Sequence, residues 1–95
     1  TAAVCYNDEV AIQLVDIAER QGILIPEDLS LVGMDDANLA PVCWVPLTTL
    51  RHPKEALGRK AAENLLQMIE NAAFDGNYLF PAEPVLRASV GKPGK

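Results

Sequence analysis

Two pairs of polar residues have side chains suited to ligand binding, and each pair directly follows a short apolar run. Asn7 and Asp8 follow one short apolar run, and Asp35 and Asp36 follow another. An amide both donates and accepts hydrogen bonds, and a carboxylate accepts them, so such a pair suits the vicinal hydroxyls of a sugar. The alternative is that these residues cap the helix or turn that follows them. Spacing alone leaves sugar binding and capping equally open.

Catalytic and metal chemistry have little support in the sequence. It contains no glycine-rich phosphate loop, no G-x-S-x-G elbow and no H-E-x-x-H motif. The single histidine, His52, is typical of a cap or a solvated residue. Asp35 and Asp36 do not suit an acid/base pair, because adjacent strand residues point to opposite faces. Cys5 and Cys43 are too few and too far apart for a disulfide framework or a zinc knuckle. We therefore expect no enzyme activity, no metal and no cofactor.

Composition excludes several broad classes of protein. The 95 residues are 49% hydrophobic and 22% charged, which is typical of one small globular domain. The net charge of −5 disfavours nucleic-acid binding by this chain itself, since phosphate contacts need clustered Lys and Arg. No apolar run approaches the roughly 20 residues of a membrane helix, and the first residues lack the layout of a signal peptide. A reduced, cytoplasmic setting is expected.

A strand–helix–strand unit is predicted to position the two polar pairs. Residues 2–6 form a short apolar run, residues 10–20 carry apolar side chains at helical spacing, and residues 29–34 form a second apolar run. Such a unit gives two parallel strands with a right-handed crossover. In open α/β sheets, ligands bind beyond the carboxyl ends of the strands, which is where both polar pairs fall.

The rest of the chain is predicted to add two strands and a second helix. Residues 47–50 are strand-like, a helix is expected from Pro53 to about residue 71, and residues 85–90 are predicted as the last strand. So small a sheet leaves edges and faces uncovered, which indicates a piece of a larger α/β domain.

One loop is more apolar than a solvated loop should be. Val42, Cys43 and Trp44 stand in an irregular stretch between two prolines. Packing within the chain is the default explanation, and a subunit interface is the other. We favour the interface slightly, because a fragment has few surfaces of its own to cover these side chains.

Four motifs in order carry a family resemblance. They are Cys5-Tyr6-Asn7-Asp8-Glu9-Val10-Ala11, the stretch from Gly22 to Asp36 (GILIPEDLSLVGMDD), Pro46-Leu47-Thr48-Thr49-Leu50, and Leu57-Gly58-Arg59-Lys60-Ala61-Ala62. Over residues 1 to about 90 the chain resembles the carboxyl-terminal part of the effector-binding region of LacI/GalR-type transcriptional repressors. The motifs Tyr6-Asn7-Asp8-Glu9 and His52-Pro53-Lys54-Glu55 are most similar to bacterial arabinose repressors, whose sensor follows a GntR-like DNA-binding head.

The resemblance implies an α/β chain that is part of a periplasmic-binding-protein-like fold, with parallel sheets flanked by helices. In that fold two subdomains hold the effector between them. Residues 1–50 would belong to the C-terminal effector-binding subdomain. Residues 51–80 would form a hinge crossing and a helix of the N-terminal subdomain, and residues 81–95 the hinge return, last strand and tail.

The resemblance also implies roles for single residues. Asn7 and Asp35 stand where the family hydrogen-bonds its effector, and His52 stands near the cleft-side hinge, where Gln is commoner. Asp8 and Asp36 are similar to capping and structural residues. The residues that resemble the dimer-forming surface lie on the helix at 10–20 and in the loop at 39–45, and are Ile12, Val15, Val42, Cys43 and Trp44.

The implied function is the ligand-sensing and dimerising part of a sugar-responsive bacterial repressor. Its expected partners are a monosaccharide effector such as arabinose, a second copy of itself, and operator DNA through a head absent from this chain. A sugar-binding protein of a transport system is one alternative, because it shares the fold. An enzyme using Asp35 and a dimerisation module without a ligand are the others.

Overall fold

The computed structural model describes residues 1–94, which divide into two units. The first unit comprises Thr1–Arg51 together with the chain from Glu83 onward, and the second unit is His52–Ala82. Each unit is described by itself. Among residues 1–94, no helix is long and apolar enough to cross a membrane.

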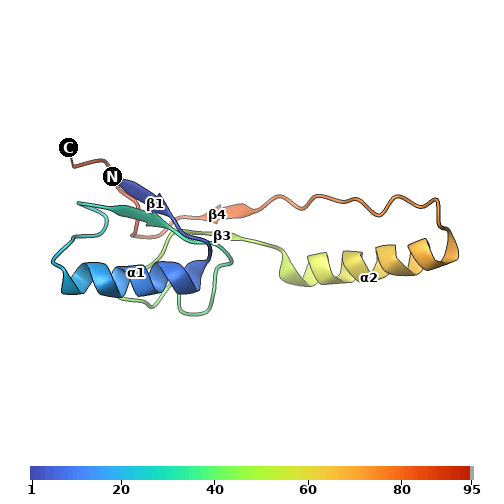
Figure 1. The fold of residues 1–95 in the computed structure, drawn as a ribbon, viewed down its shortest axis with the longest axis horizontal. Coiled ribbons are helices and arrows are strands. Elements are labelled where there is room, and N and C mark those ends of the chain that lie inside the picture. Colours follow the sequence, from blue (N-terminus) through green and yellow to red (C-terminus); the bar gives the residue numbers. More distant parts are fainter. Residues whose placement is uncertain (95) are drawn as a thin grey trace. The chain divides into compact units, whose positions relative to one another are not determined.

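The first unit begins with the predicted strand–helix–strand arrangement (Figure 1). Strands β1 (Ala2–Val4) and β2 (Ser30–Val32) pair in parallel, as the sequence predicted, although both are shorter than the apolar runs. Helix α1 (Asp8–Arg20) begins where the Asn7 side chain accepts a hydrogen bond from a backbone N–H. It ends just before Gly22, whose φ of +71° lies in the left-handed region that favours glycine.

Two further strands complete the first unit. Strand β3 (Thr49–Arg51) follows a parallel bridge between Val32 and Thr48, which joins it to β2. Strand β4 (Glu83–Val85) pairs antiparallel with β3. The prediction of a last strand over residues 85–90 is therefore wrong in its position.

After β4 the chain leaves the strand ladder, and its backbone forms hydrogen bonds with side chains as well as with backbone groups. The backbone N–H of Arg87 donates to the Thr48 hydroxyl at 2.9 Å instead of to a strand carbonyl. The Ser89 hydroxyl then donates to the Leu31 carbonyl at 2.6 Å and accepts from the Thr48 N–H at 2.8 Å. Ser89 is thus fully buried, whereas Leu86 and Val90 remain exposed, and the segment is not a strand.

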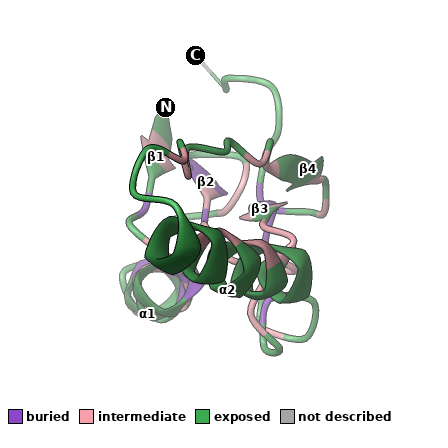
Figure 2. Ribbon diagram, turned by 90° about the vertical axis from the view of Figure 1, so that its right-hand side faces the viewer, coloured by how far each residue is buried: buried purple, intermediate pink, exposed green. Residues whose placement is uncertain are grey.

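The core of the first unit lies between α1 and the strands, where Figure 2 shows the buried residues gathering. The buried face of α1 repeats at three- and four-residue intervals through Ala11, Val15 and Ala18. The core cluster consists of Cys5, Ala11, Val15, Leu31, Ala40 and Leu47.

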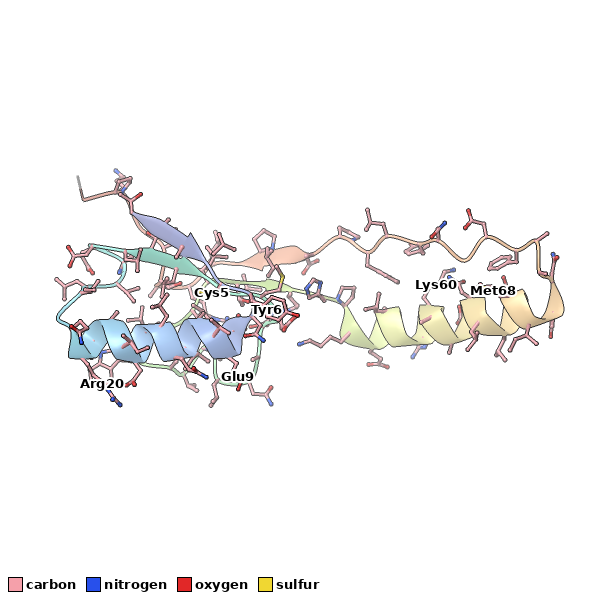
Figure 3. The ribbon with its side chains drawn as sticks, in the orientation of Figure 1. Cys5, Tyr6, Glu9, Arg20, Lys60 and Met68 are labelled. Atoms are coloured by element: carbon pink, nitrogen blue, oxygen red, sulfur yellow. The ribbon has the colours of Figure 1, made fainter. Side chains whose placement is uncertain are left out.

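The second unit is helix α2 (Lys54–Glu70) with the extended segment that follows it. No residue of α2 is buried. On the side of α2 that faces the returning segment, Lys60 places its ammonium 5.1 Å from the centre of the Tyr78 ring (Figure 3). Four residues further along α2, on the same side of the helix, the Asn64 amide donates to the Gly76 carbonyl at 2.8 Å. These contacts connect the helix to its own return segment.

Candidate functional site

The residues that follow β1 and β2 meet at one edge of the sheet. The backbone N–H of Asp8 donates to the Met34 carbonyl at 2.9 Å, and that of Asp35 donates to the Leu50 carbonyl at 2.9 Å. The ends of β1, β2 and β3 are therefore directly connected. We call Asn7, Asp8 and residues 33–36 the carboxyl edge. It is the position at which open α/β sheets bind ligands.

Asp8 has a structural role at the carboxyl edge. Its side chain is 1% exposed. One carboxylate oxygen accepts from the Thr49 hydroxyl at 2.6 Å, and the other accepts from the Ala37 N–H at 2.7 Å. A Cβ at Gly33 would overlap the first of these oxygens, which is why glycine stands there. Asp8 thus ties the start of α1 to β3 and to the loop after β2. It does not cap α1.

Asn7 is the helix cap, so the capping role that the sequence left open is present. Its Oδ1 accepts from the Val10 N–H at 2.9 Å. This is the side chain's only hydrogen bond within residues 1–94, so the amide nitrogen keeps two donors for a ligand. Capping and ligand binding are therefore compatible at this residue.

Asp35 and Asp36 form a turn with an uncommon backbone. Their φ values are +102° and +51°, in a region that residues other than glycine rarely adopt. The turn is held by the bond from Asp35 to β3 and by a 3.3 Å bond from the Asp36 N–H to the Thr49 hydroxyl. Both aspartates are half-buried.

The carboxylate of Asp36 binds two arginines. One oxygen accepts from Arg87 at 2.7 Å and the other from Arg51 at 2.9 Å. The hydrogen bond from Arg87 is the main cause that lowers the pKa of Asp36; partial burial opposes it and Arg51 adds to it. Asp36 is therefore ionised at neutral pH and takes part in the structure of the turn, while Asp35 stays the candidate ligand.

The cysteines and His52 are the other residues that the sequence singled out for their chemistry. Burial raises the pKa of the Cys5 thiol and of the Cys43 thiol, which disfavours the reactive thiolate at both. Within residues 1–94, no three His, Cys, Asp or Glu side chains are grouped so that they could hold a metal ion. His52 is half-buried and is the first residue of the second unit.

Several residues of this region were missed by sequence reasoning. Thr49, Arg51 and Arg87 bond to Asp8 or Asp36, but none of them was singled out as a site residue, although Thr49 stands in a family motif. Arg87 gave the one usable signal, because it is a lone charge within the apolar run at 85–90. A partly buried cation of this kind needs an acidic partner.

A hollow of about 400 Å³ lies between α1 and the loop that follows β2. Its lining consists of Ile12, Val15, Asp16, Glu19, Leu39, Cys43 and Trp44, which we call the apolar groove. Trp44 is 75% exposed and the nearby Val42 is 72% exposed. Ile12 and Cys43 are half-buried. Val15 is only 2% exposed and belongs to the core, so it can offer little surface to a partner.

The profile of the periplasmic-binding-protein-like domain family matches residues 1–90. The chain belongs to this family. An arabinose metabolism transcriptional repressor of Geobacillus stearothermophilus is 47% identical over 92 residues, which are 95% of this chain and 25% of that protein. The resemblance to LacI/GalR-type repressors and the expected fold class are both confirmed.

Solved structures of LacI-family proteins share the fold. The lac repressor dimer bound to operator and the anti-inducer ONPF has a TM-score of 0.87 at 31% identity, over 95% of this chain and 32% of that chain. A LacI family regulator from Enterococcus faecium with bound ribose has a TM-score of 0.80 at 31% identity, over 95% and 34%. The chain spans about a quarter of the length of the curated relatives.

Proposed function

We propose that this chain is the ligand-sensing and dimerising part of a sugar-responsive transcriptional repressor. The observation that carries the proposal is the division of roles at the carboxyl edge. Asp8 and Asp36 are used by structural bonds and the Asn7 amide nitrogen keeps its donors, while Asn7 and Asp35 follow the two strand ends where a ligand is expected. Relatives named as repressors support the regulatory context.

The proposed effector is a monosaccharide such as arabinose. Asn7 would donate to a sugar hydroxyl and Asp35 would accept from one, which matches groups that both donate and accept. We keep His52 as a third candidate on the resemblance alone. The named arabinose repressor and the ribose-bound regulator among the relatives favour a sugar over other small molecules.

The proposed organisation has two subdomains and a missing head. Residues 1–50 would be the effector-binding part, residues 51–80 a crossing and a helix of the other subdomain, and residues 81–95 the return. The separation of His52–Ala82 from the rest supports these boundaries. The whole protein would be a cytoplasmic homodimer that binds operator DNA through a separate head. The net charge of −5 supports this, because an acidic chain is poorly suited to bind DNA phosphates itself.

The proposed regulation follows from binding thermodynamics. A ligand shifts a repressor between its DNA-binding and released states only by its differential affinity for them. Asn7 and Asp35 would supply part of that difference. The exposed Trp44 and Val42, with Ile12 and Cys43, would join two copies through the apolar groove.

Calorimetric titration of the full-length protein tests the proposal. The panel is L-arabinose, D-ribose, other simple sugars and purines, applied to the wild type, Asp35→Ala and the control Glu63→Ala, which removes an exposed carboxylate on α2. We expect saturable sugar binding that Asp35→Ala weakens roughly ten- to a hundredfold, the effect of losing one buried hydrogen bond, and that Glu63→Ala leaves unchanged.

Other outcomes would contradict the proposal in distinct ways. Wild-type affinity in Asp35→Ala would remove this residue from the site. Silence of the folded wild type across the whole panel would favour a dimerisation module without a ligand. Sugar binding with no effect of the sugar on operator binding would favour the transport alternative.

A further inference from the structure

The Asp36 carboxylate connects three segments that are far apart in the sequence. Asp36 lies in the turn after β2, Arg51 is the last residue of β3, and Arg87 lies two positions beyond β4. Each carboxylate oxygen accepts from one guanidinium, at 2.7 Å from Arg87 and 2.9 Å from Arg51. We call this arrangement the Asp36 clamp.

The two arms of the clamp are held differently. Arg87 is 17% exposed, and its guanidinium also donates to the Leu47 carbonyl at 2.9 Å, so it is fixed from two sides. Arg51 is 53% exposed, and Asp36 is its side chain's only partner within residues 1–94. The Arg87 guanidinium is therefore fixed independently of Asp36, whereas the position of the Arg51 guanidinium depends on Asp36.

The two arginines of the clamp flank the second unit in the sequence. Arg51 directly precedes His52, where the second unit begins, and Arg87 follows the point at which the chain returns from that unit at Glu83. The carboxylate thus ties the turn to both chain segments that lead between the units.

The turn itself needs such support. Consecutive non-glycine residues with φ of +102° and +51° persist only where surrounding contacts determine them. Asp35 is the first of these two residues, so the position of its carboxylate depends on how firmly the next residue is held. A small displacement of a hydrogen-bonding group is enough to lose most of its contribution to binding.

We propose that Asp36 is a positioning residue for effector binding, which holds the turn that presents Asp35 through its pairs with Arg87 and Arg51. The proposal rests on the proposed function, in which Asp35 contacts a sugar. Because Arg51 is the last residue of β3, the same carboxylate also links the turn to that strand. A change in the position of β3 would therefore alter the position of the Asp35 carboxylate.

The test is a double-mutant cycle on the full-length protein, titrated with L-arabinose and D-ribose. The variants are Asp36→Asn, Arg51→Gln, the double substitution and the conservative Arg51→Lys. The matched control is Arg59→Gln, which breaks another exposed pair, with Glu55 at 3.2 Å on α2. Circular dichroism below the unfolding temperature confirms that each sample is folded, so that affinity is compared between folded proteins.

We expect Asp36→Asn to raise the dissociation constant roughly tenfold and Arg51→Gln to raise it about threefold. The double variant should bind no more weakly than Asp36→Asn, because both changes remove the same pair. Arg51→Lys, which keeps a donor and the charge, should recover part of the loss, and Arg59→Gln should bind like the wild type.

Failure of this inference is distinguishable from failure of the proposed function. If the wild type binds neither of these sugars, the cycle is run with the sugar of the wider panel that does bind, and if none binds, the proposed function is wrong and the inference is overturned with it. If the wild type binds while Asp36→Asn or Arg51→Gln binds equally well, only the inference is overturned. Additive effects in the cycle would also overturn it. Should Asp36→Asn fail to fold, the half-exposed Arg51 variants still decide the outcome.

Discussion

Replacement of Asp8 by alanine should destabilise the first unit more than any exposed substitution. The side chain is 1% exposed and its two oxygens accept hydrogen bonds of 2.6 Å and 2.7 Å, from the Thr49 hydroxyl and the Ala37 N–H. Truncation removes both bonds and leaves a buried hydroxyl and a half-buried N–H without their acceptor. The start of α1, strand β3 and the turn after β2 lose their common anchor.

The magnitude follows from the bonds that are lost. A hydrogen bond to a charged group contributes about 1.5–3 kcal/mol, so the loss of two lowers the free energy of unfolding by about 3–6 kcal/mol. This is a large share of the ~5–15 kcal/mol that stabilises a typical domain. Asp8→Asn keeps one accepting oxygen, and we expect it to lose about half as much.

Urea unfolding of the full-length protein, followed by circular dichroism, measures the effect. The matched control is Glu55→Ala, which removes an exposed carboxylate from α2 and breaks only the exposed pair with Arg59 at 3.2 Å. Such a pair contributes about 0.3–0.5 kcal/mol. An Asp8→Ala protein within about 1 kcal/mol of the wild type would refute the reasoning that these buried bonds hold the edge together.

Three further predictions address packing, pH and association. Gly33→Ala places a Cβ onto the Asp8 carboxylate and should cost about 1–3 kcal/mol in the same urea assay, whereas Gly58→Ala, in open space on α2, should gain about 0.5–1 kcal/mol. Because the folded-state pKa of Asp36 is lowered, its pairs stabilise the protein fully above about pH 4 and are lost as the pH falls through the folded-state pKa. The stability difference between wild type and Asp36→Asn should therefore be constant from about pH 5 to 7 and shrink below about pH 4; a difference that persists at low pH would contradict this. Trp44→Ser, at a 75% exposed position, should raise the dimer dissociation constant at least about tenfold in sedimentation experiments, and an unchanged constant would remove the apolar groove from the interface.

The sequence by itself determined the local elements and the edge at which to look for a site. Apolar periodicity predicted α1, and the flanking apolar runs predicted the parallel strands β1 and β2. These features depend on neighbours within a few positions along the chain, so a pattern in the sequence reports them directly. The rule that ligands bind beyond parallel strand ends then pointed to the pairs Asn7–Asp8 and Asp35–Asp36, and the family resemblance narrowed them to Asn7 and Asp35.

Only the tertiary structure decided what each polar residue at that edge does. Asp8 binds the Thr49 hydroxyl from 41 positions away, and Asp36 binds Arg87 from 51 positions away. Long-range bonds also accompany the end of the last strand at Val85, since Arg87 donates its N–H to the Thr48 hydroxyl from 39 positions away. A hydrogen-bond partner is set by which distant group reaches a side chain after folding, and no local pattern of residue types contains that information.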